Sequence, residues 1–145
     1  MKTEENYKVI IADDSHIFIN GIKLLFEELP QYEIIDFAYN GDEIVNHPNL
    51  GNIDLLLLDV NMPLLDGISA GRQINFQFPY LKMVAITLNS DQVYLEQLIR
   101  AGFKGFIDKA NITSQLDTVL NQVMNNNFAF PKEILSKLVN KSESS

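Results

Sequence analysis

The chain has 145 residues, a formal net charge of −8 and no cysteine. This length suits one ordinary domain, and the lack of cysteine excludes a disulfide framework, a thiolate nucleophile and a cysteine-ligated zinc site. Only 11 residues are Lys or Arg, which argues against nucleic-acid binding by this chain because such binding relies on cationic contacts to phosphates. We expect a cytoplasmic protein. The N-terminus lacks the apolar core of a signal peptide, and no apolar run approaches the ~18 residues of a membrane span.

Short apolar segments alternate with longer amphipathic ones. Strands are predicted over residues 7–12, 32–38, 54–58, 81–87 and 105–108. Several are apolar without alternation, as strands covered on both faces are. Helical spacing of apolar residues follows in four groups: Ile17, Ile22, Leu25, Phe26 and Leu29; Ile68, Gly71, Ile74 and Phe78; Val93, Leu95, Leu98 and Ile99; and Ile112, Leu116, Val119, Leu120 and Val123. The alternation predicts an α/β fold with helices on both faces of a parallel sheet.

The secondary structure of two parts of the chain is less clearly predicted. Within residues 36–52, Asn40-Gly41 suggests a helix start and residues 48–52 suggest a loop. Residues 131–141 carry a short helical pattern, and residues 142–145 are expected to be disordered. We see no room for a second domain.

Four predicted strands end in polar or charged side chains. These are Asp13 and Asp14 after the first strand, Asp59 after the third, Thr87 at the end of the fourth, and Asp108 and Lys109 at the end of the fifth. The carboxyl ends of parallel strands lie on one edge of a sheet, where open α/β folds bind their ligands. We therefore expect these groups to converge.

Each group alone has an ordinary explanation: Asp13 and Asp14 as a helix cap with a spare acid, Asp59 as the start of a loop, Thr87 as a strand residue and Lys109 as a solvated lysine. Together, three carboxylates repel one another and require a proton, a lysine or a cation, and their oxygens suit Mg²⁺. A carboxylate beside both positive charges is poised to attack phosphorus. The set indicates aspartyl-phosphate chemistry.

At these positions the sequence resembles the receiver domains of two-component response regulators. The matching segments are Val9-Ile-Ile-Ala-Asp-Asp14, Leu57-Leu-Asp-Val-Asn-Met-Pro63 with Asp66-Gly67, Val84-Ala-Ile-Thr87 and Lys104-Gly-Phe-Ile-Asp-Lys109. The resemblance implies a flavodoxin-like (CheY-like) α/β fold, a five-stranded parallel sheet of order 2-1-3-4-5 flanked by five helices. It places a lead at residues 1–6, a receiver at 7–127, and a linker, short helix and tail without an effector domain at 128–145.

The resemblance also implies roles for the carboxylates. Asp59 resembles the aspartate that a sensor histidine kinase phosphorylates. Asp14, Asp59 and the backbone carbonyl of Asn61 resemble the direct ligands of Mg²⁺, with Asp13 assisting through water. We expect a regulatory domain that catalyses only its own phosphotransfer and dephosphorylation, and not an enzyme acting on other substrates.

Three further residues match the switch of that family. Thr87 and Lys109 resemble the pair that grips the phosphoryl group, and Phe106 resembles the aromatic residue that swings inward as the threonine moves. Leu88 follows Thr87 where small residues are frequent, and we hypothesise that it slows hydrolysis of the aspartyl phosphate.

The finer resemblance is to receivers of NarL/FixJ-type (LuxR-family) transcription factors. It rests on Gly21 and on the segments at residues 101–110 and 128–133. It implies an output in transcription through a DNA-binding domain absent from this chain, with possible homodimerisation on phosphorylation. Two other classes remain open. One is a phosphohydrolase or phosphotransferase with an aspartate nucleophile, for which no general acid is evident, and the other is a phosphate-independent binding module.

Overall fold

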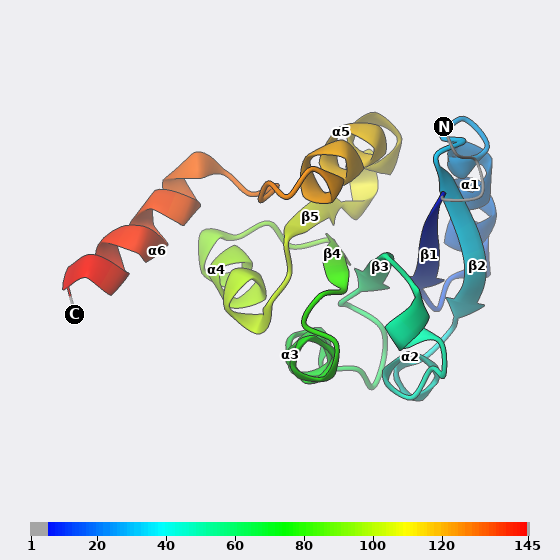
Figure 1. Ribbon diagram of the computed structural model, residues 1–145, viewed down its shortest axis with the longest axis horizontal. Coiled ribbons are helices and arrows are strands. Elements are labelled where there is room, and N and C mark those ends of the chain that lie inside the picture. The colour runs from blue at the N-terminus through cyan, green and yellow to red at the C-terminus, as the bar shows by residue number, and fades with distance from the viewer. Residues whose placement is uncertain (1–5, 145) are drawn as a thin grey trace.

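A computed structural model describes residues 6–144 of the protein, with side chains as far as Leu138. Five parallel strands form one sheet of order β2-β1-β3-β4-β5 (Figure 1). The strands are β1 (Tyr7–Ala12), β2 (Tyr32–Ala38), β3 (Leu55–Asp59), β4 (Lys82–Thr87) and β5 (Gly105–Asp108). The helices are α1 (His16–Phe26), α2 (Gly41–Val45), α3 (Gly67–Gln77), α4 (Gln92–Ala101), α5 (Ile112–Met124) and α6 (Lys132–Ser144), with 3₁₀ turns η2 (Leu50–Asn52) and η3 (Lys109–Asn111). The predicted fold and strand order are confirmed.

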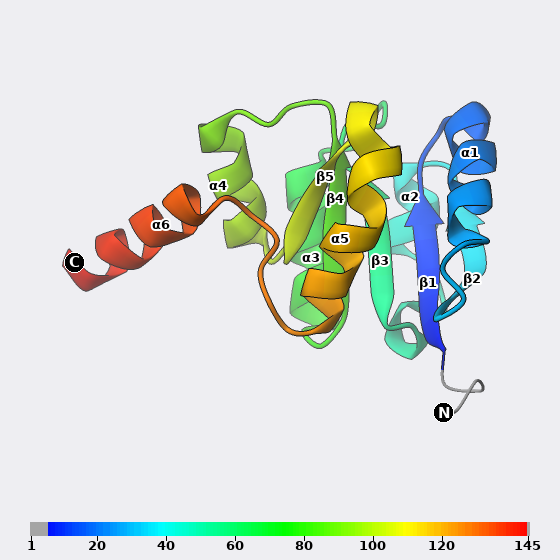
Figure 2. The ribbon, with the colours of Figure 1, turned by 90° about the horizontal axis from the view of Figure 1, so that it is seen from above.

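Helices cover both faces of the sheet, with α1 and α5 on one face and α2, α3 and α4 on the other (Figures 1 and 2). Because successive strand residues point to opposite faces, each strand contributes to two apolar clusters. Leu56 and Leu58 of β3 pack with the α3 and α4 side, whereas Leu55 and Leu57 pack with the α1 and α5 side. All four are fully buried, which explains why this strand is apolar without alternation.

Side-chain caps start several of the helices that follow the strands. Ser15 accepts the N–H of Phe18 at the start of α1, Asp66 accepts two N–H groups at the start of α3, and Asp91 accepts one at the start of α4. Helix α4 ends at Gly102, whose φ of 108° is unstrained in glycine because it has no Cβ. The caps determine where each of these helices begins beyond the carboxyl edge of the sheet.

The structure corrects several details of the prediction. Strand β3 spans Leu55–Asp59 and not residues 54–58, so Asp59 is the last residue of the strand rather than the first beyond it. Ile17 and Val93, expected in apolar stripes, are 87% and 63% exposed. Both lie in the first turn of a helix with the side chain exposed, and Ile19 is the first buried residue of α1.

Beyond α5 the chain returns to the open edge of the sheet. Ala129 forms a parallel bridge with Gly105 of β5, and α6 then packs against α4. The tail expected to be disordered from residue 142 is helical as far as Ser144, which is consistent with the helix propensity of Lys and Glu. Residues 1–5 of the expected lead, and Ser145, lie outside the described residues.

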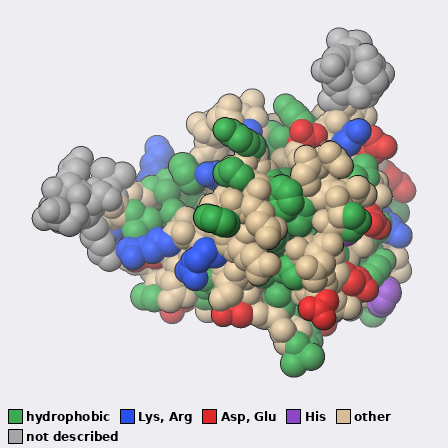
Figure 3. Space-filling model, turned by 60° about the horizontal axis from the view of Figure 1, so that its bottom comes forward, with side chains coloured by type: hydrophobic (Ala, Val, Ile, Leu, Met, Phe, Trp, Pro, Cys, Tyr) green, Lys and Arg blue, Asp and Glu red, His purple; other side chains and the backbone are tan. Residues whose placement is uncertain are grey.

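The surface is polarised along the sheet. On the face shown in Figure 3, most basic side chains lie toward the end from which α6 emerges, and acidic side chains gather toward the opposite end. Among residues 6–144, no helix is long and apolar enough to cross a membrane.

Candidate functional site

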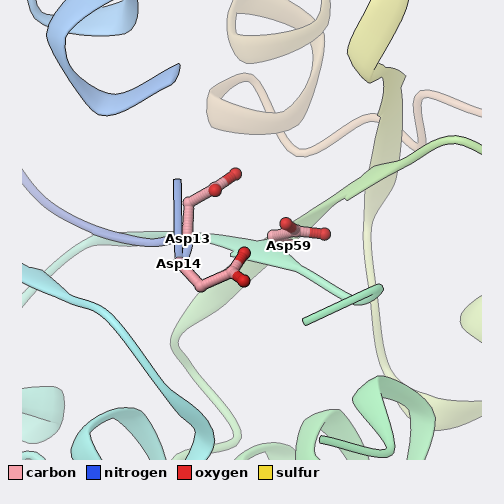
Figure 4. A group of neighbouring side chains, drawn as sticks. All are labelled: Asp13, Asp14 and Asp59. Atoms are coloured by element: carbon pink, nitrogen blue, oxygen red, sulfur yellow. The ribbon is translucent and has the colours of Figure 1, made fainter. Parts of the chain in front are cut away.

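The carboxyl ends of β1 and β3 bring three carboxylates together (Figure 4). Asp13 and Asp14 follow β1 and Asp59 ends β3, and one oxygen from each lies within 4.8 Å of the others. Asp13 is 0% and Asp59 2% exposed, whereas Asp14 is exposed. In the part of the chain that the structure describes, the buried polar residues are Asp13, Asp59 and Thr87.

Lys109 supplies the positive charge of the site. Its Nζ lies 2.9 Å from Oδ2 of Asp13 and donates a hydrogen bond of 3.1 Å to Oδ2 of Asp59. The same ammonium lies 4.6 Å from the centre of the Phe18 ring, within the range of a cation–π contact. Since Lys109 comes directly after β5, the site joins the ends of three strands and the first helix.

Burial and neighbouring charges shift the pKa values of Asp13 and Lys109. Burial is the largest effect on Asp13 and raises its pKa, and the negative charge of Asp59 raises it further. Hydrogen bonds from Lys109 and from the Ser15 N–H lower this pKa, but the net shift is upward. Burial alone would lower the pKa of Lys109, but the hydrogen bonds and charges of Asp13 and Asp59 outweigh it and raise that pKa. The lysine is therefore firmly cationic between two acids.

The oxygens of the cluster leave room for a metal ion. Oδ1 of Asp13 accepts the N–H of Ser15 at 2.8 Å and Oδ1 of Asp59 accepts the N–H of Asn61 at 2.8 Å. Oδ2 of Asp13 is buried, and its one partner among the described residues is Nζ of Lys109, 2.9 Å away. Converging carboxylates with spare lone pairs are the hard oxygen ligands that Mg²⁺ prefers, so the residues present fit that ion.

The loop between β4 and α4 is held by two polar side chains. The hydroxyl of Thr87 donates to the carbonyl of Asn89 at 3.1 Å and accepts its N–H at 2.9 Å. Oδ1 of Asn61 accepts the N–H of Leu88 at 3.0 Å. The Thr87 hydroxyl is therefore engaged with its own loop, and we find no hydrogen bond between it and Asp59 within residues 6–138. The Leu88 side chain is 69% exposed.

The structure does not bring every predicted residue to the carboxylates. Phe106 is half-buried and pairs in register with Ala85, whereas Asp108 pairs with Thr87, so Phe106 lies two positions back along β5. Its ring stacks on Phe130 with centroids 5.6 Å apart. The hydrogen bond from the Leu88 N–H to the Asn61 side chain has no signal in the sequence, because it depends on the approach of two loops in the fold.

Sheet order and acidic edge together define a receiver-like fold. The family model of the response regulator receiver domain matches residues 9–121, and the chain belongs to this family. Among curated relatives, the transcriptional regulatory protein YdfI of Bacillus subtilis is 31% identical over 131 residues, which is 90% of this chain and 61% of the relative. The oxygen regulatory protein NreC of Staphylococcus carnosus is 28% identical over 92% of this chain and 62% of the relative.

Solved structures agree with this assignment. The RcsB response regulator of Salmonella typhimurium is 27% identical, with a TM-score of 0.78 over 94% of this chain and 68% of that one. The isolated receiver domain of RcsB with the phosphomimetic BeF₃⁻ is 25% identical, with a TM-score of 0.79 over 92% of this chain and 98% of that one. The relatives are regulators of the LuxR/NarL type, as the finer resemblance predicted. The chain spans 45% to 62% of the length of the first curated relatives it matches.

Proposed function

We propose that this chain is a phosphorylation-activated switch in which Asp59 accepts a phosphoryl group from a sensor histidine kinase. The observation that carries the proposal is the position of Lys109, whose ammonium lies 2.9 Å from Asp13 and 3.1 Å from Asp59 at the buried end of β3. A fixed positive charge beside the accepting oxygen stabilises the charge that develops on a transferring phosphoryl group.

The transfer is a simple displacement. An oxygen of Asp59 forms the new P–O bond while the P–N bond of a phosphohistidine donor breaks, and the leaving imidazole keeps the electron pair and takes up a proton. Asp14, Asp59 and the carbonyl of Asn61 would hold Mg²⁺, with Asp13 acting through water, and the ion would supply further positive charge to the phosphoryl oxygens. Lys109 would then pair with an oxygen of the new phosphoryl group.

Thr87 is the proposed reader of the phosphoryl group. Its hydroxyl now bonds both backbone groups of Asn89, so reaching a phosphoryl oxygen requires that it leave this loop. The exchange would bias the β4–α4 loop between two states, with Phe106 following the threonine. The surface around α4 and β5 would then change, which offers a place for an output partner or for dimerisation with a second copy.

The output that we propose is control of transcription in the cytoplasm. Support comes from the names of the relatives, several of which are transcriptional regulatory proteins. DNA contact would be made by a domain outside this chain, because the chain itself is acidic, with a net charge of −8.

Leu88 is proposed to set the lifetime of the phosphorylated state. Its side chain is 69% exposed directly after Thr87, where it would restrict the approach of water to a phosphoryl group on Asp59. We expect Leu88→Ala to dephosphorylate faster. An unchanged rate of loss of the phosphoryl group, followed by intact mass, would dispose of this role.

The proposed function is tested by incubating the protein with Mg²⁺ and acetyl phosphate and measuring its intact mass. Wild type should gain one phosphoryl group and Asp59→Asn none. Asp54→Asn is a matched control, because Asp54 directly precedes the first residue of β3, is exposed, and uses its carboxylate to accept the N–H of Lys8. This variant should be phosphorylated as wild type is. A folded wild type that gains no mass would contradict the switch and favour a phosphate-independent module.

A further inference from the structure

The open edge of the sheet is covered by the chain itself. The Ala129 N–H donates to the carbonyl of Lys104 at 2.9 Å, and the N–H of Phe106 donates to the carbonyl of Ala129 at 3.4 Å. A Cβ added to Gly105 would lie 2.8 Å from the Cβ of Ala129, so the glycine permits the close approach. The segment that leads into α6 is thus paired to β5 through a single parallel bridge at Ala129.

Side chains of the same segment extend the core. Phe130 is 8% exposed and stacks on Phe106 with centroids 5.6 Å apart and planes at 27°. Ile134, in the first turn of α6, is 5% exposed. Both belong to the apolar cluster that contains Leu98 and Ala101 of α4. Figure 2 shows the segment passing beside β5 and α6 beginning next to α4.

Strand β5 connects this cover to the acidic site. Only Ile107 and Asp108 separate Phe106 from Lys109, which binds Asp13 and Asp59. Asp108 is paired in register with Thr87. A change in the contacts of Lys109 or Thr87 therefore acts on a four-residue strand whose other side holds Ala129 and Phe130.

We propose that residues 129–138, the C-terminal cover, are the element through which the site signals. The cover is held on β5 and α4 while Asp59 is unmodified. It loosens when a phosphoryl group on Asp59 draws Lys109 and Thr87 to itself and shifts Phe106 from its stack with Phe130. This inference rests on the proposed function and adds to it a defined output element within the chain. A single contiguous path of contacts, Lys109 to β5 to Phe130, links the two regions.

The absence of tryptophan from the sequence makes the cover directly observable. In Phe130→Trp the only indole replaces a buried ring of the cover, and in the control Phe76→Trp it replaces a ring on α3 that is 87% exposed. Both variants are treated with Mg²⁺ and acetyl phosphate, and fluorescence and intact mass are read from the same sample. We expect the emission of Phe130→Trp to move to longer wavelength as the phosphoryl mass appears and to return as it is lost. The emission of Phe76→Trp should not change.

The readings separate the two proposals. Phosphoryl mass without a change in Phe130→Trp emission overturns the role of the cover and leaves the phosphorylation switch standing. No phosphoryl mass on any form, wild type included, overturns the switch and the cover together.

Hydrogen exchange on the wild-type chain gives the same test without a substitution, should Phe130→Trp fold poorly. The amides of Ala129 and Ile134, both hydrogen-bonded to backbone carbonyls, should exchange at least several-fold faster in the phosphorylated chain. The amides of α3 should exchange at an unchanged rate. Equal protection of the cover in both forms would refute the proposal.

Discussion

The interior of the sheet and its carboxyl edge are formed by the same strands from opposite kinds of residue. Leu57 and Leu58 are 0% exposed among apolar side chains, and the next residue, Asp59, is 2% exposed among two acids and a lysine. Burying apolar surface stabilises the fold, whereas burying like charges costs free energy. A single step along β3 therefore separates a position that maintains the fold from one kept for its chemistry.

The largest effect on stability is expected from the interior. Leu57→Ala should lower the free energy of unfolding by about 2–5 kcal/mol, since it leaves a cavity between β3 and the helices of one face. Urea unfolding gives the value. Leu24→Ala on α1, where the side chain is 64% exposed, serves as control and should change stability by no more than about 0.5 kcal/mol. A similar loss in both variants would contradict the distinction between the two regions.

The edge should respond differently to the loss of its cation. Lys109→Met is expected to lower stability by about 1–3 kcal/mol, because it leaves Asp13 and Asp59 as unpaired neighbours. The range lies below that of a fully buried pair because the lysine side chain is 19% exposed. Adding Asp13→Asn to Lys109→Met should recover part of the loss, as measured by urea unfolding. Strict additivity of two destabilising changes would show that the charges are not coupled.

Mg²⁺ binding at the carboxyl edge should stabilise the folded protein. At ten times its dissociation constant, the ion should raise the free energy of unfolding of wild type by about 1.4 kcal/mol. Thermal unfolding with and without the ion measures this, and Asp14→Asn should lose most of the increase. Asp117→Asn, an exposed acid on α5, should keep it. An equal loss in both variants would indicate a general charge effect and no defined site.

The smallest effect that we expect is a dependence on pH at Asp13, in the presence of a chelator. Because burial raises the pKa of Asp13 above its ordinary value of 3.8, the folded state holds this proton more tightly than the unfolded state. Its contribution to stability is present below pH 3.8 and is lost as the pH rises through the raised pKa. Wild type should therefore lose stability relative to Asp13→Asn as the pH rises, and the opposite slope would refute the assignment.

The sequence predicts the strands and the residues at their ends, but not the contacts that depend on the paths of loops. Apolar runs and their spacing predict the strands, and the resemblance to receiver domains implies their order. Parallel topology then places Asp13, Asp59 and Lys109 at one edge of the sheet. The direction of the Thr87 hydroxyl could not be predicted, because it depends on the path of a loop. The bond from the Leu88 N–H to Asn61 spans 27 residues and depends on two loops packing together. Pairing of Ala129 with β5 likewise has no periodic signal.

That pairing has a practical consequence for anyone who builds hybrid proteins from this chain. Gly105 leaves space that Ala129 fills, with 2.8 Å between a hypothetical Cβ and the Cβ of Ala129. A fusion joined before Ala129 would expose the ring of Phe106 and the edge of β5 to whatever is attached. A junction after Leu138 would carry the whole cover into the hybrid, and with it a native surface for the new partner to meet.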